Sequence, residues 1–217
     1  MKKNNNIAII PARKNSKGLK FKNRLLFNYT KRFINKISWF NKVIFATDDD
    51  YFVSKCKSTN YIFYKRKKKN SLENSSIKSV MKEVIKTFNL SKDTVVWLFY
   101  LTIPERKLSD FKKLKKITTN KKFVSAMSFI PIKTHPYDCW IIKKNIKKFI
   151  KNDVFRRQDK IELFEHHHYL CAFKVKEINK LNSELLNSNT LPIILNKEII
   201  EIDSRNDLNK FTNKRKL

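Results

Sequence analysis

The chain has 217 residues, 41% of them hydrophobic, which suffices for one domain with a sizeable core and excludes wholesale disorder. Its longest apolar stretch, residues 95–103, is about half as long as a membrane-spanning helix, and its three dispersed cysteines argue against a disulfide framework, so we expect a cytoplasmic protein without a membrane partner. The formal net charge of +30 suggests a polyanionic ligand, but a coding sequence rich in A and T would produce the same excess of Lys, so we do not expect nucleic acid to be the partner.

The first half of the chain alternates apolar runs with amphipathic stretches. Residues 6–10 form a nearly continuous apolar run closed by Pro11, which is typical of a strand buried on both faces. Similar runs predict strands at 42–46, 61–64, 94–101 and 123–129. The stretches between them predict helices at 27–40, 51–56, 75–88 and 107–117. This alternation predicts an α/β fold with a mostly parallel central sheet and helices on both faces.

The alternation breaks at about 130–167, where Pro, Lys and aromatic residues are frequent and residues 137–142 suggest a hairpin. After the break, the pattern predicts a strand at 169–175, a helix at 176–186, strands at 192–195 and 198–202, and a last helix after Asp203. We interpret the chain as a single domain, residues 1–217, with an arm inserted at about 130–167.

The loop after the first predicted strand, residues 11–23, carries the clearest chemical signal. It lies at the carboxyl end of a strand, where open α/β sheets bind ligands. It offers Arg13, Lys17 and Lys22 together with Gly18, the chain's single glycine, which allows the backbone to approach a ligand closely. Basic side chains and backbone N–H groups of this kind form phosphate cradles. The spacing matches neither the GxxxxGK[ST] loop nor the dinucleotide-binding GxGxxG loop.

Two further polar runs could mark sites. Residues 65–69 are five consecutive cations, which we interpret as a solvated loop. The consecutive histidines His166, His167 and His168 suggest a metal site, but adjacent residues of a strand point to opposite faces, so all three cannot easily bind one ion. We interpret them as the junction between a loop and the following strand. His135, which precedes Pro136, is similarly ambiguous.

Residues 7–23, IAIIPARKNSKGLKFKN, resemble the opening signature IIPARxGSKGxxxKN of the acylneuraminate cytidylyltransferases. Later segments resemble further motifs of this family in the same order. Residues 43–48 match a strand that ends in Thr/Ser-Asp, and residues 73–77 match a DTASSI-type helix start. Residues 98–106 match LLQPTSPLR, residues 155–159 match RRQD, and residues 201–208 match a closing (D/E)IDTPEDL. The first motif is the most specific, and the matches together extend from residue 7 to residue 208.

The resemblance implies a Rossmann-like fold of the nucleotide-diphospho-sugar transferase type. It also implies an enzyme that transfers CMP from CTP to the anomeric hydroxyl of a nine-carbon 2-keto sugar acid and releases pyrophosphate. Arg13, Lys22 and Asp203 would be the catalytic residues. The nucleotide site would consist of Ala12, Arg13, Ser16, Lys22, Asn23, Ser75 and Ser76.

A divalent cation, Mg²⁺ or Mn²⁺, is also implied by the resemblance, with Glu201 and Asp203 as its ligands. Such hard cations prefer carboxylate and phosphate oxygens. The two residues alternate along a predicted strand, so both should face the same side of the sheet.

The resemblance gives the arm a role as well, because in this family the corresponding region mediates dimerisation and lends basic residues to the partner's site. We therefore expect a homodimer in which Tyr100, Arg156, Arg157 and Lys133 lie near the sugar acid. Arginine presents a planar fork to a carboxylate. A purely structural role in ion pairs is an equal alternative for Arg156 and Arg157.

The chain departs from the family pattern mainly on the acceptor side. Tyr100 replaces Gln, Leu101 and Ile103 replace Pro and Ser, and Lys14-Asn15 replaces the usual glycine of the first loop. Sialic, legionaminic and pseudaminic acid all stay open as acceptors. The eight-carbon 3-deoxy-manno-octulosonate branch fits less well, because its first loop typically lacks the SKGxxxKN pattern. Two alternatives remain, a basic nucleic-acid-binding protein without catalysis and a catalytically degenerate homologue.

Overall fold

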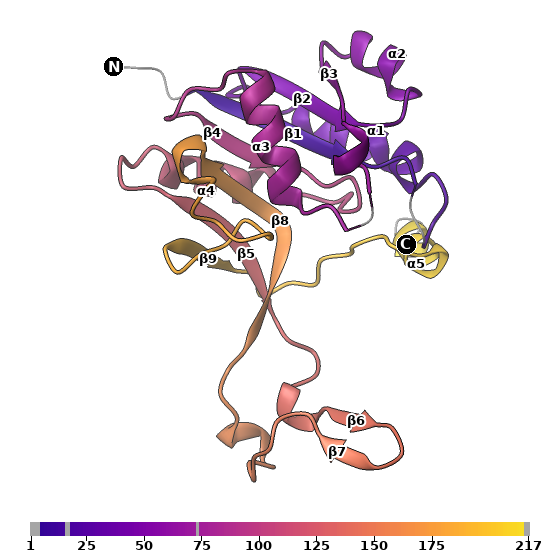
Figure 1. Ribbon diagram of the computed structural model, residues 1–217, viewed down its shortest axis with the longest axis vertical. Coiled ribbons are helices and arrows are strands. Elements are labelled where there is room, and N and C mark those ends of the chain that lie inside the picture. Colours follow the sequence, from indigo (N-terminus) through magenta and orange to yellow (C-terminus); the bar gives the residue numbers. More distant parts are fainter. Residues whose placement is uncertain (1–4, 16–17, 73, 215–217) are drawn as a thin grey trace.

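A seven-stranded, mainly parallel sheet forms the centre of the protein in the computed structural model, which describes residues 5–15, 18–72 and 74–214 (Figure 1). In spatial order the strands are β3 (Ile62–Lys65), β2 (Lys42–Thr47), β1 (Asn6–Ala12), β4 (Val95–Leu98), β8 (Phe164–Lys174), β5 (Ser125–Pro131) and β9 (Thr190–Ile194). Among these seven, β8 is antiparallel to both of its neighbours, β4 and β5, and the other pairs are parallel.

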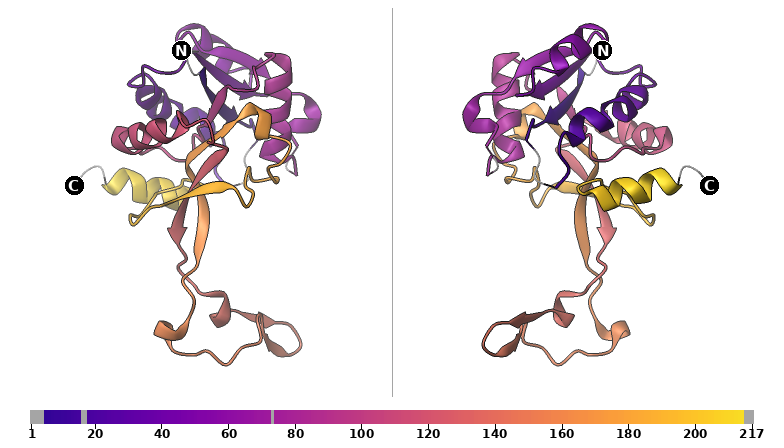
Figure 2. Two further views of the ribbon diagram at one scale, coloured as in Figure 1. Left: turned by 90° about the vertical axis from the view of Figure 1, so that its left-hand side faces the viewer. Right: turned by 90° about the vertical axis from the view of Figure 1, so that its right-hand side faces the viewer.

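Helices cover both faces of the sheet because successive residues of each strand enter two different cores. β1 contributes Ala8 and Ile10 to one core and Ile7 and Ile9 to the other. The first core is covered by α1 (Lys22–Ile34), α2 (Phe52–Lys57), α4 (Leu108–Thr118) and α5 (Arg205–Lys214), and the second by α3 (Ile77–Thr87). Figure 2 shows helices on either side of the sheet, which confirms the predicted fold class. Within the described ranges, no helix has the length and apolar character needed to cross a membrane.

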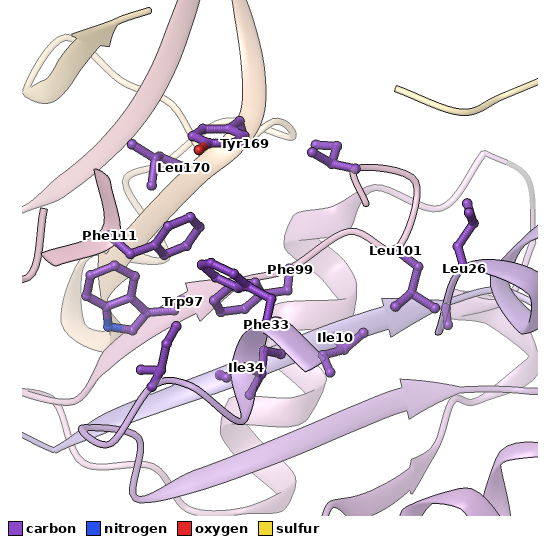
Figure 3. Close-up of a cluster of buried hydrophobic side chains, with 14 of the residues drawn as sticks. Ile10, Leu26, Phe33, Ile34, Trp97, Phe99, Leu101, Phe111, Tyr169 and Leu170 are labelled. Atoms are coloured by element: carbon purple, nitrogen blue, oxygen red, sulfur yellow. The ribbon is translucent and has the colours of Figure 1, made fainter. Parts of the chain in front are cut away.

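Aromatic rings fill the centre of the first core (Figure 3). Phe111 of α4 is 1% exposed, and its ring lies 4.8 Å from Phe33 and 5.4 Å from Phe99, between ring centroids. Trp97 and Tyr169 complete the ring contacts of Phe111, at 6.3 and 5.9 Å. Phe111 therefore connects the sheet to both α1 and α4.

Phe111→Ala is expected to lower the free energy of unfolding by about 3–5 kcal/mol, because it removes a buried ring and leaves a cavity that its neighbours cannot fill. Urea unfolding followed by circular dichroism measures the change. Ile117→Ala on the same helix is the control, because Ile117 is 39% exposed. Its cost should stay below about 1 kcal/mol. Equal losses in the two variants would contradict the packing role of Phe111.

The arm consists of the residues between β5 and β8, which leave the sheet together and project from it (Figures 1 and 2). It contains an antiparallel hairpin of β6 (Trp140–Ile142) and β7 (Ile146–Lys148), and two single turns, η2 (Pro136–Asp138) and η3 (Arg157–Asp159). The hairpin therefore includes the end of the predicted segment 137–142 but extends further along the chain.

Two predicted helices differ from the structure. The helix predicted at 27–40 is α1, which begins at Lys22 and ends at Ile34; Phe21, with φ 57°, turns the chain directly into it. The helix predicted at 176–186 does not form beyond the single turn η4 (Val175–Glu177). There the side-chain oxygen of Asn182 accepts hydrogen bonds from the N–H groups of Glu184 and Leu186, which competes with helical hydrogen bonding.

Three further predictions near the end of the chain and in the histidine run also need correction. Residues 198–202 form no strand, because they cross the edge of the sheet, where Ile202 N donates to Thr102 O at 2.8 Å, rather than joining a ladder. His166–His168 lie inside β8 and not at a loop-to-strand junction. The cation run at 65–69 is not one solvated loop, because Lys65 ends β3 and residues 68–70 form the short 3₁₀ turn η1 (Lys68–Asn70).

Candidate functional site

A cavity of about 270 Å³ lies at the carboxyl ends of β1, β3 and β4. The chain runs from β1 to β2 on one side and returns to β4 on the other, so the loops after β1 and β4 diverge and leave a crevice. Larger hollows of about 480 and 700 Å³ exist, but they contain no residue of the loop after β1. The 270 Å³ cavity is lined by Pro11, Arg13, Lys22, Asn23, Arg66, Leu72, Ser75, Ile77, Val80, Tyr100, Leu101, Thr102, Glu201 and Asp203.

Hydrogen bonds hold the loop after β1 in position beside this cavity. Asn23 Nδ2 donates to Arg13 O at 2.7 Å, which links the two ends of the loop. Lys14 N donates to Asp48 Oδ1 at 2.8 Å, which links the loop to the residues after β2. The backbone around Arg13 is therefore fixed while its side chain lines the cavity.

A bidentate ion pair fixes the start of α1 to the same region. Arg24 Nε and Nη2 each donate to the carboxylate of Asp49 at 2.8 Å, and Asp49 is 3% exposed. The guanidinium of Arg24 also lies over the rings of Phe21 and Tyr51, at 4.4 and 4.6 Å from their centroids. The hydrogen bonds from Arg24 lower the pKa of Asp49 despite its burial, so this pair stays charged.

The two predicted metal ligands come together at the opposite wall of the cavity, although not through strand alternation. Glu201 Oε1 accepts a hydrogen bond from Thr102 Oγ1 at 2.9 Å, and the backbone of the next residue also bonds to Thr102. Asp203 pairs with Lys22. Thr102, which follows β4, therefore positions the carboxylate of Glu201, whereas Lys22 positions that of Asp203.

His167, on strand β8, lies next to the carboxylate of Glu201. Burial lowers the pKa of His167, so its ring is neutral; Nδ1 accepts from Tyr169 N at 3.2 Å, and Nε2 lies 3.6 Å from Glu201 Oε2. A bulge in β8 produces this orientation: Ser128 faces His167, whereas the adjacent Met127 faces Cys171. Ser128 Oγ bridges the bulge by accepting from Leu170 N at 2.9 Å and donating to His167 O.

The donor set of Glu201 and Asp203 fits a hard divalent cation. Mg²⁺ is commonly bound by one or two carboxylates together with substrate phosphates. Partial burial raises the pKa of Glu201, and the charge of Asp203 raises it further. A cation between the two carboxylates would offset this repulsion.

Gly18 allows the loop after β1 to pack against this wall. A Cβ atom at Gly18 would lie 2.2 Å from the carbonyl oxygen of Asp203 and 3.2 Å from its carbonyl carbon. Real Cβ atoms do not approach backbone that closely, so any larger residue would push the loop and the Asp203 segment apart.

Gly18→Ala is therefore expected to destabilise the protein by about 1–3 kcal/mol. Thermal unfolding measures the effect. Lys20→Ala, two residues away on an exposed side chain, should leave the melting temperature unchanged. A Gly18→Ala variant with an unchanged melting temperature would show that the close approach is not needed.

Other predicted site residues lie in different surroundings. Ala12 is buried at the end of β1, and Ser75 lines the cavity while donating to Lys69 O at 2.6 Å. Ser76 is not among the lining residues, because it caps α3 by accepting from Ser79 N at 3.2 Å. Ser16 lies outside the described residues.

Arg156 and Arg157 lie on the exposed arm and do not line the cavity of their own chain, whereas Tyr100 does. Arg106, in the segment after β4, donates from Nη2 to Tyr100 O at 2.5 Å and from Nη1 to Thr30 at 3.2 Å. Burial lowers the pKa of Arg106 to about 9. Arg106 thus holds the backbone of Tyr100 against α1.

Arg66 is the charged lining residue that the sequence analysis missed. It follows β3 directly, its N–H donates to Thr47 O at 2.9 Å, and its Nη2 donates to Asn70 O. Its Nε is buried without a hydrogen-bond partner among the described residues. Burial lowers the pKa of Arg66, and the charge of Arg13 lowers it further. Its place at the carboxyl end of a predicted strand was the signal that could have separated it from the neighbouring lysines.

Comparison with known proteins supports the fold. No protein-family model matches the chain, and no curated protein sequence matches it. The solved structure of CMP:2-keto-3-deoxy-manno-octonic acid synthetase complexed with CTP is similar, with a TM-score of 0.68 and 14% identity over 98% of this chain and 100% of that one. The 4-diphosphocytidyl-2C-methyl-D-erythritol synthase of Anaerococcus prevotii is also similar, with a TM-score of 0.64 and 14% identity over 99% and 97% of the two chains.

Proposed function

We propose that this protein transfers CMP from CTP to a sugar acid and releases pyrophosphate. The observation that carries the proposal is the convergence of three cations, Arg13, Lys22 and Arg66, and two carboxylates, Glu201 and Asp203, on one cavity at the carboxyl edge of the sheet. A nucleoside triphosphate with a bound divalent cation matches this charge pattern. Two similar solved structures carry names of enzymes that make cytidine-containing products.

The reaction is an in-line displacement at the α-phosphorus. The anomeric hydroxyl oxygen of the acceptor forms a bond to this phosphorus, the bond to the pyrophosphate oxygen breaks, and the hydroxyl proton passes to solvent. A bound Mg²⁺ would supply charge neutralisation for the phosphates. Arg13 and Arg66 would bind phosphate oxygens, and Asn23 would hold the Arg13 backbone in place.

Lys22 and Asp203 would exchange partners when the substrate binds. Their ion pair places a cation of the triphosphate site against a ligand of the metal site. Binding of the triphosphate and its metal together offers each of them a new partner of opposite charge, so neither is left unpaired. This exchange favours the metal-bound nucleotide over either component alone.

The acceptor side would be formed by Tyr100 and by a second copy of the chain. The arm exposes large apolar side chains, among them Trp140 at 55%, Ile142 at 77% and Phe155 at 79%. A patch of this kind is typical of a protein–protein interface. We propose a homodimer in which Arg156 and Arg157 of one arm reach the cavity of the other chain and bind the carboxylate of the sugar acid.

Mixing two impaired variants tests this shared site. Arg13→Ala and the double variant Arg156→Ala/Arg157→Ala should each retain only a small fraction of the wild-type rate when alone. After unfolding and refolding together, they should recover about a quarter of the wild-type rate, because random pairing makes half of the dimers mixed and each mixed dimer has one intact site. Variants mixed without refolding are the control. No recovery in a refolded sample that is dimeric by light scattering would contradict the shared site.

The function itself is tested by pyrophosphate release from CTP and Mg²⁺ with a panel of acceptors. The panel contains sialic, legionaminic and pseudaminic acids, the eight-carbon 3-deoxy-manno-octulosonate and a phosphorylated methylerythritol. Release with a nine-carbon acid is the expected result, and release with another acceptor would correct the acceptor class. CTP binding without release from any acceptor would favour the degenerate homologue. Failure to bind CTP, with salt-sensitive binding to nucleic acid, would favour the non-catalytic alternative.

A further inference from the structure

We propose that His166, His168 and Glu184 form a binding site for a transition-metal ion of the Zn²⁺ type, distinct from the pair Glu201 and Asp203. One potential ligand atom from each of the three residues lies within 4.8 Å of the others. The rings of His166 and His168 lie 5.3 Å apart, and His166 Nε2 lies 3.8 Å from Glu184 Oε2. This inference does not depend on which substrate the cavity binds.

The fold brings these three side chains together beside the bulge in β8. The rings of His166 and His168 lie close to each other, whereas His167 between them points toward Glu201. Glu184 is presented by the turn that replaces the predicted helix, in which Asn182 bonds to the N–H groups of two later residues and Leu185 has a φ of 67°. The argument that three consecutive histidines cannot easily bind one ion still holds, because only two of the three belong to the proposed site.

The donor chemistry selects the type of ion. Two imidazoles and one carboxylate suit Zn²⁺ and its neighbours among the transition metals, whereas Mg²⁺ prefers oxygen ligands. His168 is the most buried of the three side chains, whereas His166 and Glu184 are exposed. Nε2 of His168 is buried without a hydrogen-bond partner among the described residues, which is unfavourable for a polar atom.

The spacing needs only a small adjustment. Ligand atoms around a tetrahedral Zn²⁺ ion lie roughly 3.4 Å from one another, so the present spacing of up to 4.8 Å must close by up to about 1.4 Å. The side chains of His166 and Glu184 are 38% and 48% exposed, so both can move toward the more buried His168. Three protein ligands leave a fourth position for water.

The site has a direct connection to the cavity through Tyr100. The ring of Tyr100 lines the cavity and packs edge-on against His168, with 4.8 Å between ring centroids. An ion held by His168 would therefore fix the position of Tyr100 and also connect β8 to the turn around Glu184. The metal-binding residues would act as positioning residues for this wall.

Calorimetric titration with Zn²⁺, in the presence of saturating Mg²⁺, tests the proposal, and the absorption spectrum of added Co²⁺ reports tetrahedral nitrogen and oxygen ligands. We expect one Zn²⁺ per chain. His166→Ala and Glu184→Gln should each weaken binding about tenfold or more, and both positions are exposed enough for the variants to fold. Saturating Zn²⁺ should also raise the melting temperature of the wild-type protein but not of these variants.

Matched controls distinguish Zn²⁺ binding at this site from Zn²⁺ binding by other side chains of the protein. Glu201→Gln should retain the Zn²⁺ affinity, because Glu201 belongs to the other carboxylate pair. His135→Ala should also retain it, although His135 and Cys139 on the arm offer a nitrogen and a sulfur atom that Zn²⁺ can bind. Unchanged affinity in both His166→Ala and Glu184→Gln, loss of binding in Glu201→Gln or His135→Ala, or no binding by the wild-type protein would each overturn the proposal.

Discussion

Asp203→Asn is expected to lower pyrophosphate release by about 100-fold or more and to remove its response to Mg²⁺. An amide is a much weaker ligand for Mg²⁺ than a carboxylate, and the metal provides several kcal/mol of charge stabilisation in reactions of this kind. Glu201→Gln should have a similar effect, because Glu201 is held in the same wall by Thr102. Initial rates over a range of Mg²⁺ concentrations measure both losses.

Glu198→Gln is the matched control, since it makes the same carboxylate-to-amide change three residues before Glu201 at an exposed position outside the cavity. It should leave the rate and the Mg²⁺ dependence unchanged. An Asp203→Asn enzyme with an ordinary response to Mg²⁺ would rule out Asp203 as a ligand.

The pH dependence of the wild-type protein should follow Glu201. Partial burial and the charge of Asp203 raise the pKa of Glu201, so this group takes up a proton at a higher pH than an ordinary glutamate. A protonated carboxyl does not bind Mg²⁺, so the Mg²⁺ concentration for half-maximal rate should rise as the pH falls through this raised pKa.

Arg13→Ala is the variant with the second large effect, an expected loss of roughly 10- to 150-fold in kcat/KM for CTP. This range corresponds to about 1.5–3 kcal/mol, the usual strength of a hydrogen bond to a charged group. The Arg13 side chain lines the cavity, while its backbone is held by Asn23, so the fold should not change. Steady-state kinetics and calorimetric CTP binding measure the loss.

Lys14→Ala is the control for Arg13→Ala, because Lys14 is the next cation in the chain, is exposed and bonds to Asp48 through its backbone N–H. It should retain nearly all of the activity. Equal losses in the two variants would mean that the loop acts through its overall charge and not through Arg13. Normal kinetics of Arg13→Ala would contradict the assignment of Arg13 to the phosphates.

The sequence by itself determined the order of most strands and helices and the position of the basic loop after β1. Each of these is a local signal: β1 is a continuous apolar run, and the loop after it combines cations with Gly18 within a few residues. Arg13, Lys22, Tyr100, Glu201 and Asp203 line one cavity, so the residues that the family resemblance assigned to a site do lie together, while their roles stay predictions. Local patterns and a resemblance of motifs together were enough to predict these features.

Only the tertiary structure decided which residues meet across the sheet. Thr102 binds Glu201 although 99 positions separate them, and the segment around Glu201 forms no strand that alternation could describe. Likewise, Glu184 reaches His166 because hydrogen bonds from the N–H groups of Glu184 and Leu186 to the side chain of Asn182 replace a helix that the apolar spacing predicted. Periodicity reports the local environment of a residue, whereas these contacts depend on how distant segments pack and on which backbone groups still need hydrogen-bond partners.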